Sequence, residues 1–365
     1  MKLATRLVAW QRLHGRHDLP WQNTTDPYRV WLSEIMLQQT QVSAVIPYYQ
    51  RFLKHYPDVG SLAKAPSEDV MALWAGLGYY ARARNLHACA KVVMQDWAGQ
   101  FPSDAKGLTS LPGIGPSTAA AIASFCYAER IAILDGNVKR VMARYFAVEG
   151  DVTTKTVEQQ LWQHATAELP TATQLRRDPD IMSAYTQGLM DLGATLCTRH
   201  QPDCMNCPIQ SGCAAFKHGR TQELPWPKSR KAVPERAIGM LIACHQGNIL
   251  LEKRPNSGIW GGLWSLPEIS HPDDPGSKDS IMAAFCASLG LQSKKTHALP
   301  SFQHIFTHFK LNISPVLLHA RNDSPVVKLQ RQMEWVSVKK LPGLGMPAPV
   351  RKMLDGLMMD GLLTK

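Results

Sequence analysis

The chain has 365 residues, and its 40 Lys and Arg against 29 Asp and Glu give a formal net charge of +11. This length suits two domains, and the charge favours nucleic acid or an anionic membrane surface as partner, although a generic basic protein with a solvated surface has the same balance. No apolar run approaches the roughly twenty residues of a membrane span, and the first residues, with Lys2, Arg6 and Arg12, lack the apolar core of a signal peptide. We therefore expect a cytoplasmic protein, which excludes secreted and membrane-spanning classes.

The first domain is predicted to be mostly helical and to cover residues 1–217. Apolar residues recur there every three or four positions, and Pro and Gly punctuate the pattern. The repeats fall at residues 30–49, 70–77, 120–123 and 138–145. Residues 218–234 follow, and their prolines among basic residues are typical of a linker.

The second domain, residues 235–365, is predicted to be α+β. A β-hairpin is expected from residues 237–243 and 248–252, joined by a Gly247-Asn248 turn. Further strands are expected at 263–269, 311–318 and 333–338, and helices near 279–289 and 347–358.

Four cysteines lie within seventeen residues, with six, two and five residues between successive members. They are Cys197, Cys204, Cys207 and Cys213. Such dense thiolates favour a zinc or iron–sulfur site, because the four other cysteines are scattered singly, as in a reduced protein. Two disulfides are the alternative, and the spacing does not separate zinc from iron.

A glycine-rich turn, Leu-Pro-Gly-Ile-Gly-Pro-Ser-Thr, occupies residues 111–118 and opens an alanine-rich helix. The two glycines let backbone N–H groups project, and Pro116 suits the first helical position. A helix N-terminus presented in this way fits a DNA phosphate, whereas the plainer interpretation is an ordinary turn between helices.

Two carboxyl groups are candidates for chemistry. Glu34 shares a helix face with Val30 and Leu37, where desolvation would raise its pKa and make it a proton donor. From the pattern alone we favour the alternative, a solvated Glu34 paired with Arg29. Asp135 follows an apolar run and precedes Gly-Asn; it either caps the next helix or delivers a carboxylate to a cleft.

Together, the hairpin turn, the aspartate some twenty residues later and the cysteine spacing resemble the helix-hairpin-helix DNA glycosylases that carry an iron–sulfur cluster. The resemblance implies a [4Fe-4S] cluster on the four cysteines. The endonuclease III branch has a lysine two residues after the last glycine of the hairpin, where this chain has Ser117. Residues 31–42, 76–84 and 135–140 instead resemble the MutY family of adenine DNA glycosylases.

Residues 260–267, Trp-Gly-Gly-Leu-Trp-Ser-Leu-Pro, resemble the nudix-like C-terminal domain of that family. A working nudix hydrolase needs a glutamate-rich helix, and residues 280–289 contain no acidic residue. A recognition role is therefore expected. The family's Phe-Ser-His loop, which inspects 8-oxoguanine, corresponds to Phe306, Thr307 and His308. The fold expected overall is a helix-hairpin-helix glycosylase domain with a [4Fe-4S] loop, followed by a nudix-like domain.

The resemblance also implies roles for single residues. Glu34 would protonate N7 of a flipped adenine, and Asp135 would stabilise the sugar cation. The adenine pocket would include Arg16, Trp21, Gln187 and Ser117; Gln38 and Tyr79 would enter the duplex; Gly113, Gly115 and Lys139 would hold the DNA backbone.

The implied partner is double-stranded DNA with an A:8-oxoguanine or A:G mispair, bound by a monomer. Three alternatives stay open: a pyrimidine-lesion glycosylase and lyase of the endonuclease III type, a nucleotide hydrolase, and a DNA sensor with inactive carboxylates. The first needs an amine nucleophile where Ser117 stands.

Overall fold

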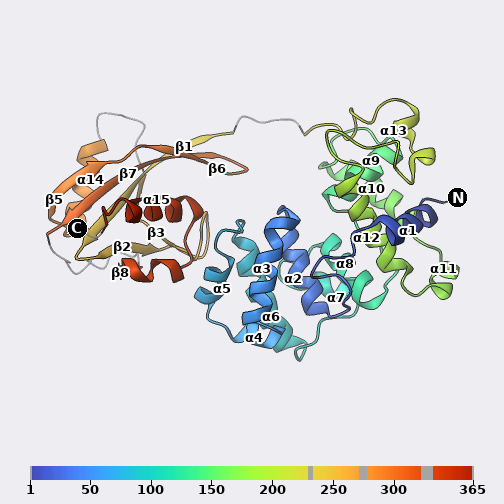
Figure 1. The fold of residues 1–365 in the computed structure, drawn as a ribbon, viewed down its shortest axis with the longest axis horizontal. Helices are drawn as coiled ribbons and strands as arrows, with labels where there is room; N and C mark the ends of the chain where they lie inside the picture. The colour runs from blue at the N-terminus through green and yellow to red at the C-terminus, as the bar shows by residue number, and fades with distance from the viewer. Residues whose placement is uncertain (1, 229–232, 271–277, 322–331, 364–365) are drawn as a thin grey trace. The chain divides into compact units, whose positions relative to one another are not determined.

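The computed structural model describes residues 2–228, 233–270, 278–321 and 332–363 (Figure 1). Two compact units are present. One consists of residues 1–64 and 85–230, and the other of residues 65–84 and 231–365. Residues 65–84 thus group with the C-terminal part of the chain, a division that the sequence did not predict. The boundaries expected at 217 and 235 stay a prediction.

Helices build the first unit. Their starts follow local chemistry: the side chain of Asp26 caps the helix that begins at Pro27, and Thr171 forms a capping box with Gln174. The helices of this unit are α1 (Leu3–His14), α2 (Pro27–Leu37), α3 (Val42–His55), α4 (Val59–Lys64), α7 (Ala105–Thr109), α8 (Pro116–Tyr127), α9 (Gly136–Tyr145), α10 (Lys155–Ala167), α11 (Ala172–Arg177), α12 (Ile181–Thr195), the 3-10 helix η1 (Gln210–Gly212) and α13 (Ala214–Lys217).

Two helices lie wholly or partly in residues 65–84. Helix α5 (Ser67–Trp74) lies in residues 65–84, and α6 (Ala81–Asp96) runs from that segment into the first unit. The helical pattern predicted for residues 1–217 is confirmed, with helices at each of the four periodic stretches.

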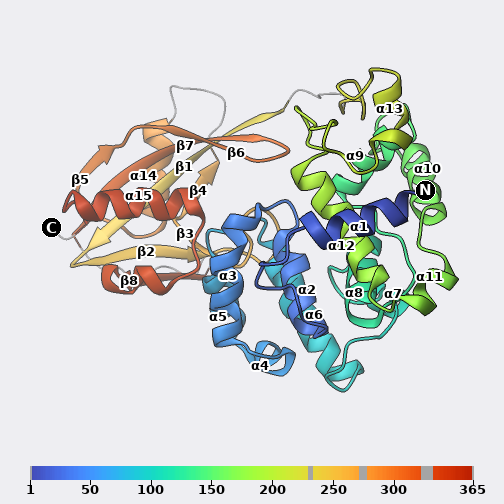
Figure 2. The same cartoon turned by 45° about the vertical axis from the view of Figure 1, so that its right-hand side comes forward.

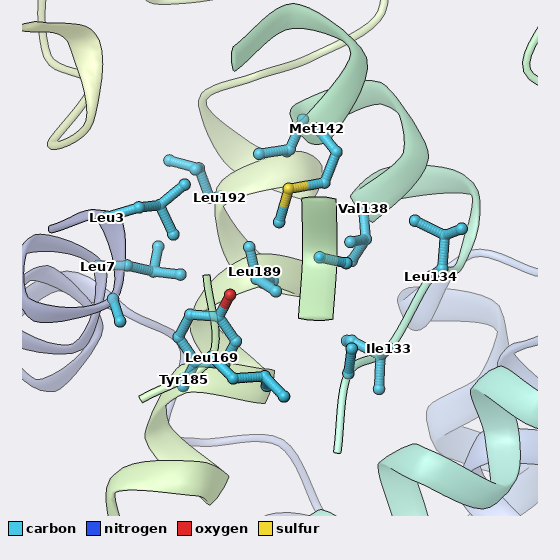
Figure 3. Packing of buried hydrophobic residues seen from close by; sticks show 14 of the residues in the cluster. Leu3, Leu7, Ile133, Leu134, Val138, Met142, Leu169, Tyr185, Leu189 and Leu192 are labelled. Carbon is cyan, nitrogen blue, oxygen red and sulfur yellow. The ribbon is translucent and has the colours of Figure 1, made fainter. Parts of the chain in front are cut away.

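A buried apolar cluster joins α1, α9 and α12 (Figure 3). Leu7 from α1, Met142 from α9 and Leu189 from α12 meet there, and each is at most 1% exposed. Burying one such side chain stabilises the fold by about 2 kcal/mol. Ile133 and Leu134 extend the cluster from the segment before α9, so the cluster fixes the backbone on which the next residue, Asp135, stands.

The second unit contains a mixed sheet of eight strands among the described residues, in the order β3-β2-β1-β7-β5, with β4 paired to β1, β6 to β7 and β8 to β2. The strands are β1 (Glu235–His245), β2 (Asn248–Lys253), β3 (Trp264–Ser265), β4 (Glu268–Ser270), β5 (Ser293–Ala298), β6 (Phe302–Ile305), β7 (Lys310–Ala320) and β8 (Gln332–Ser337). The parallel pair β1 and β7 forms the centre.

Both faces of this sheet are covered. Six successive residues of β1, 239–244, are buried, which requires a layer on each side. Leu241 and Ala243 pack against Cys286 and Leu289 of the α14 region, with α14 at Lys278–Ser288. Helix α15 (Ala348–Met359) follows the 3-10 helix η3 (Val338–Gly343) and runs along the sheet in Figure 2.

The α+β prediction for this region is confirmed, with corrections in detail. The first hairpin turns at Gln246 and Gly247, which both have positive φ, one residue before the expected turn. Pro267 divides the strand expected at 263–269 into β3 and β4, because proline has no N–H for a ladder. Strands β5 and β6 were not predicted. Helix α14 begins at Lys278 and so includes one acidic residue, Asp279.

Among the described residues, no helix is long and apolar enough to cross a membrane.

Candidate active site

Glu34 opens on to a pocket of about 570 Å³ in the first unit. This volume lies within the range of small-molecule sites, roughly 300–1,000 Å³. Helix α2 carries Glu34 into the wall, with Val30 one turn before it and Leu37 nearly one turn after it, both on the same face. The alternative, a solvated Glu34 paired with Arg29, is wrong, because Arg29 pairs with Asp26 at 3.5 Å and burial raises the pKa of Glu34.

The pocket has one aromatic and one polar side. Trp21 is 8% exposed and packs edge-on against Tyr49, with ring centroids 5.4 Å apart. Arg16 and Gln187 line the same pocket, the first from the segment after α1 and the second from α12. Three of the four residues predicted for an adenine pocket therefore meet around Glu34: Arg16, Trp21 and Gln187.

Ser117 is the exception. It does not line the pocket; instead its Oγ accepts a hydrogen bond from the backbone N–H of Leu134 at 3.1 Å. Since Leu134 precedes Asp135, the hydroxyl helps to hold the segment that carries the second carboxyl group. The structure thus places Ser117 behind the site, as a support.

Asp135 caps helix α9. Its Oδ1 accepts from the N–H of Val138 at 2.7 Å, as the capping interpretation predicted. Burial raises the pKa of Asp135, while hydrogen bonds from the Val138 and Asn137 amides and the charge of Arg140 oppose this rise. The helix N-terminus therefore favours the carboxylate form at this position.

The two carboxyl groups interact electrostatically. Burial, and secondly the negative charge of Asp135, raise the pKa of Glu34 from 4.5 to about 8. Burial raises the pKa of both groups, and only at Asp135 do helix N–H groups and a nearby cation oppose the rise. Asp135 does not line the pocket, so its charge is what links it to Glu34. A carboxyl group that keeps its proton, beside one that a helix N-terminus favours as carboxylate, separates an acid role from an anionic role.

The hairpin turn precedes α8 as predicted. Gly113 has φ +78°, and a Cβ there would lie 2.7 Å from the Cβ of Asn85, so the position requires glycine. Gly115 has φ −86° and open space around it. No side chain caps the first N–H groups of α8, which leaves them available to an anion.

Gln38 lies near this turn, and Lys139 is a residue of α9. The side-chain amide of Gln38 donates to Thr118 Oγ1 at 3.4 Å, directly after the hairpin. Lys139 stands on the first turn of α9 and pairs with Glu158, Nζ to Oε1 at 2.6 Å. The lysine predicted to meet DNA is thus held by a carboxylate in this state.

Tyr79 lies in residues 65–84, within a tight turn of the other unit. Gly76, Gly78 and Tyr79 all have positive φ, and the Tyr79 side chain is 44% exposed. Arg82 lies over the ring of Tyr79 at 5.4 Å and over that of Trp74 at 5.3 Å. This cation–π packing holds an exposed aromatic ring at a sharp bend.

The four clustered cysteines line a common cavity in the first unit. Burial raises the pKa of Cys204, Cys207 and Cys213, and the charge of Cys197 adds to the rise in each; a cationic centre between the sulfurs would offset both effects. Four thiolates are a donor set that iron–sulfur clusters use, so the residues present fit the group that the resemblance implies. Within the part of the chain that the structure describes, no set of three or more His, Cys, Asp or Glu side chains is arranged to hold a metal ion.

Two arginines secure the cysteine loop. Arg144 is 2% exposed and donates to the carbonyl groups of Thr198, Arg199 and Leu224. Arg140 donates to the carbonyl of Cys197 at 2.8 Å and to Asn137 Oδ1 at 2.9 Å. The loop and the helix capped by Asp135 are therefore joined by charge-assisted hydrogen bonds.

In the second unit the predicted recognition residues form the turn between β6 and β7. Phe306 stacks on Phe309 with centroids 4.5 Å apart, while Thr307 and His308 are exposed. Thr307 Oγ1 and His308 Nδ1 lie 3.4 Å apart. The stacked rings of Phe306 and Phe309 thus support a turn whose two polar side chains face solvent.

The sequence did not indicate several residues of the pocket, including His17 and Phe125. It also did not indicate Asp191, which does not line the pocket but accepts hydrogen bonds from Arg16 and Gln187, which do. Asp191 lies one turn after Gln187 on a helix with Leu189 and Leu192, and its side chain is fully buried. A lone carboxylate among apolar residues at helical spacing was the available signal.

Comparisons with known proteins agree with this geometry. Residues 32–166 match the HhH-GPD superfamily of base excision DNA repair proteins, and residues 238–356 match the NUDIX domain. The adenine DNA glycosylase of Buchnera aphidicola subsp. Acyrthosiphon pisum is 34% identical over 96% of this chain and 95% of its own; the human enzyme is 31% identical over 95% and 72%. A thermostable thymine-DNA glycosylase structure, 27% identical, superposes with a TM-score of 0.52 over 59% of this chain and 95% of that one. The chain belongs to the adenine DNA glycosylases of base excision repair.

Proposed function

We propose that this chain hydrolyses the N-glycosidic bond of adenine mispaired with 8-oxoguanine or guanine, without cleaving the DNA strand. The supporting observation is the pair of carboxyl groups: Glu34 lines a pocket of about 570 Å³, and burial together with the charge of Asp135 raises its pKa to about 8. The family to which the chain belongs supports adenine as the excised base.

Glu34 is the general acid of the proposed mechanism. Adenine is a poor leaving group as an anion, so a proton delivered to N7 lets the base depart neutral. A group with a pKa of about 8 is protonated at neutral pH and readily gives up its proton when the bond breaks. Glu34 is then ionised and accepts a proton from the water that completes hydrolysis.

Asp135 is the anionic partner. Loss of the base leaves positive charge on the sugar, and a carboxylate held on a rigid helix start stabilises that charge without reorganising. Its capping bond from Val138 and the apolar cluster that contains Ile133 and Leu134 fix its position.

The base must leave the duplex to reach this pocket, at a cost of roughly a few kcal/mol. We assign Gln38 and Tyr79 to the space that the adenine vacates. The uncapped start of α8, with Gly113 and Gly115, would bind phosphate through backbone N–H groups, and Lys139 would add charge once DNA competes with Glu158 for it.

Cys197, Cys204, Cys207 and Cys213 would hold one [4Fe-4S] cluster. When bound, the cluster would organise the loop and supply no step of the hydrolysis. Arg144, which donates to three carbonyl groups of this region, would keep the loop shape and place positive charge beside the sulfur of Cys197, 3.4 Å from its Nη1.

The β6–β7 turn would inspect the base opposite adenine. Thr307 and His308 offer a hydroxyl and an imidazole on the stacked support of Phe306 and Phe309. Hydrogen-bonding groups of this kind distinguish 8-oxoguanine, with its N7–H and 8-oxo groups, from guanine.

Replacing Glu34 by Gln tests the proposal directly. The glutamine side chain has no proton to transfer, so single-turnover release of adenine from an A:8-oxoguanine duplex should fall by at least about 10²-fold. Mispair affinity should stay within about threefold, because the side chain keeps its shape. Glu223→Gln, a change at a surface ion pair that is 61% exposed, is the matched control. Normal release by the Glu34 variant would refute the assignment.

The same assay separates this function from a strand-nicking lyase. The lyase position holds Ser117, whose hydroxyl is engaged with Leu134 and is not an amine nucleophile. Product strands should therefore break only after alkali treatment. Breakage without alkali, at the rate of base release, would favour the lyase.

A further inference from the structure

Asp191 is a buried carboxylate that the proposed mechanism does not use. It stands on α12 with its side chain fully buried, and three hydrogen bonds reach its two carboxylate oxygens. Its Oδ1 accepts from Nε of Arg16 at 2.7 Å and from Nε2 of Gln187 at 2.9 Å, and its Oδ2 accepts from the backbone N of Arg16 at 3.0 Å. Both partners line the pocket that contains Glu34.

The bond to Asp191 fixes the direction of the Gln187 amide. A carboxylate accepts hydrogen bonds and donates none, so only the NH₂ end of Gln187 can face it. The carbonyl Oε1 has no hydrogen-bond partner among the residues that the structure describes. Because Gln187 is half-buried in the pocket wall, this oxygen is the end of the amide that a bound base can reach.

Asp191 also fixes Arg16, which is left with donor groups where Gln187 is left with an acceptor. Asp191 takes its Nε and backbone N–H groups, and its carbonyl accepts from Gln22 at 2.9 Å. The Nη groups have no hydrogen-bond partner within the described ranges, and the side chain is 27% exposed. They remain as donors on the polar side of the pocket.

An acceptor and a donor, on two side chains that bond to the same oxygen of Asp191, match one edge of adenine. Its 6-amino group donates, and the neighbouring ring nitrogens accept. Hypoxanthine has the same two rings but a carbonyl at position 6 and N–H at position 1, so it would place an acceptor against Gln187 Oε1. Sites built for a hydrogen bond reject such analogues strongly, because a buried polar group is left unpaired.

We propose that Asp191 is a positioning residue that holds Gln187 as acceptor and Arg16 as donor, and so selects a purine with a 6-amino group over one with a 6-carbonyl group. This deepens the proposed function and rests on it. A purely structural Asp191, which only ties α12 to the end of α1, would affect both bases equally.

Asp191→Asn tests the proposal with adenine and hypoxanthine, each opposite guanine in one duplex. The new side chain offers a donor as well as an acceptor, so the Gln187 amide is free to turn its NH₂ group to the pocket. The ratio of single-turnover release rates, adenine over hypoxanthine, should fall by about tenfold or more. Equal slowing of both bases would overturn the proposal. Asp151→Asn, in a loop outside the pocket, is the matched control.

A second variant makes the result independent of folding. In a Gln187→Met background no amide is left to orient, so adding Asp191→Asn should change both rates by the same factor. If circular dichroism shows that Asp191→Asn has lost its helices, Gln187→Met alone decides: its ratio must fall by about tenfold, and an unchanged ratio overturns the proposal. A parent chain that releases no adenine would instead refute the proposed function.

Discussion

Replacing Glu34 by Gln should stabilise the chain in a way that depends on pH. In the folded chain the pKa of Glu34 is raised from 4.5 to about 8. At a pH between these values the unfolded chain releases the proton of Glu34, whereas the folded chain must either keep that proton or bury a charge. A raised acid pKa contributes stability that is fully present below pH 4.5 and is lost as the pH rises through 8. Glutamine carries no charge at any pH and escapes this loss.

The size of the effect follows from the shift. Each pKa unit corresponds to about 1.4 kcal/mol, so between about pH 5 and pH 8 the parent chain loses about 3.5 kcal/mol relative to the variant. Water in the pocket screens part of this, and we expect about 2 kcal/mol. For a unit of this size that corresponds to about 4–8 °C in melting temperature.

Thermal unfolding followed by far-ultraviolet circular dichroism at half-unit pH steps measures the difference. The melting temperature of Glu34→Gln minus that of the parent should be small at about pH 5, rise to about pH 8 and level off above it. Glu223→Gln should give a difference near zero throughout, because its ion pair with Arg220 is solvated. A difference that does not change between about pH 5 and pH 9 would refute the burial and charge assigned to Glu34.

Three further outcomes are expected. Single-turnover adenine release should be level up to about pH 8 and fall about tenfold per unit above it, because Glu34 must carry its proton; a rate that rises through about pH 9 would contradict this. Gly113→Ala should lower the melting temperature by several degrees, because φ is +78° and the new Cβ would lie 2.7 Å from that of Asn85. Gly115→Ala should leave the melting temperature unchanged and weaken DNA binding in a filter or fluorescence assay. Equal melting temperatures for the two variants would argue against the strained turn. His308→Ala should reduce the preference for 8-oxoguanine over guanine by about tenfold in the same release assay, and equal losses on both mispairs would remove the inspecting role.

Much of the first unit could be predicted from the sequence. The periodic stretches form helices, Pro116 marks the start of α8, and Asp135 caps α9 as its position before Gly-Asn suggested. These features depend on residues close together in the chain. Local chemistry therefore decides them, and tertiary packing does not reverse them.

The environment of Glu34 could not be predicted in this way. Glu34 shares a helix face with Val30 and Leu37, but glutamate is seldom fully buried, so a solvated pair with Arg29 was favoured. Packing decided otherwise: Asp26, which also caps α2, takes Arg29, and the pocket is completed by residues of α12, far along the chain. Asp191 was missed for the same reason, since its partner Arg16 comes from the opposite end of the unit's sequence.

In the second unit, short strands were the hardest elements to predict. Strand β6 alternates between half-buried and exposed residues over only four positions, and β5 contains Lys and His, so neither stood out from a loop. Their pairing with β7 decides their conformation, and β5 reaches β7 only across the intervening strand β6.

The parallel ladder between β1 and β7 has a consequence for synthesis of the chain. The paired residues join 235–244 to 310–319, so β1 has no central partner until the ribosome has made the whole of the intervening chain. Until then β1 leaves the N–H and C=O groups of one edge unpaired and its apolar side chains uncovered, so it can pair with other chains. Chains truncated before residue 310 should therefore aggregate during expression, even though their helical unit is complete.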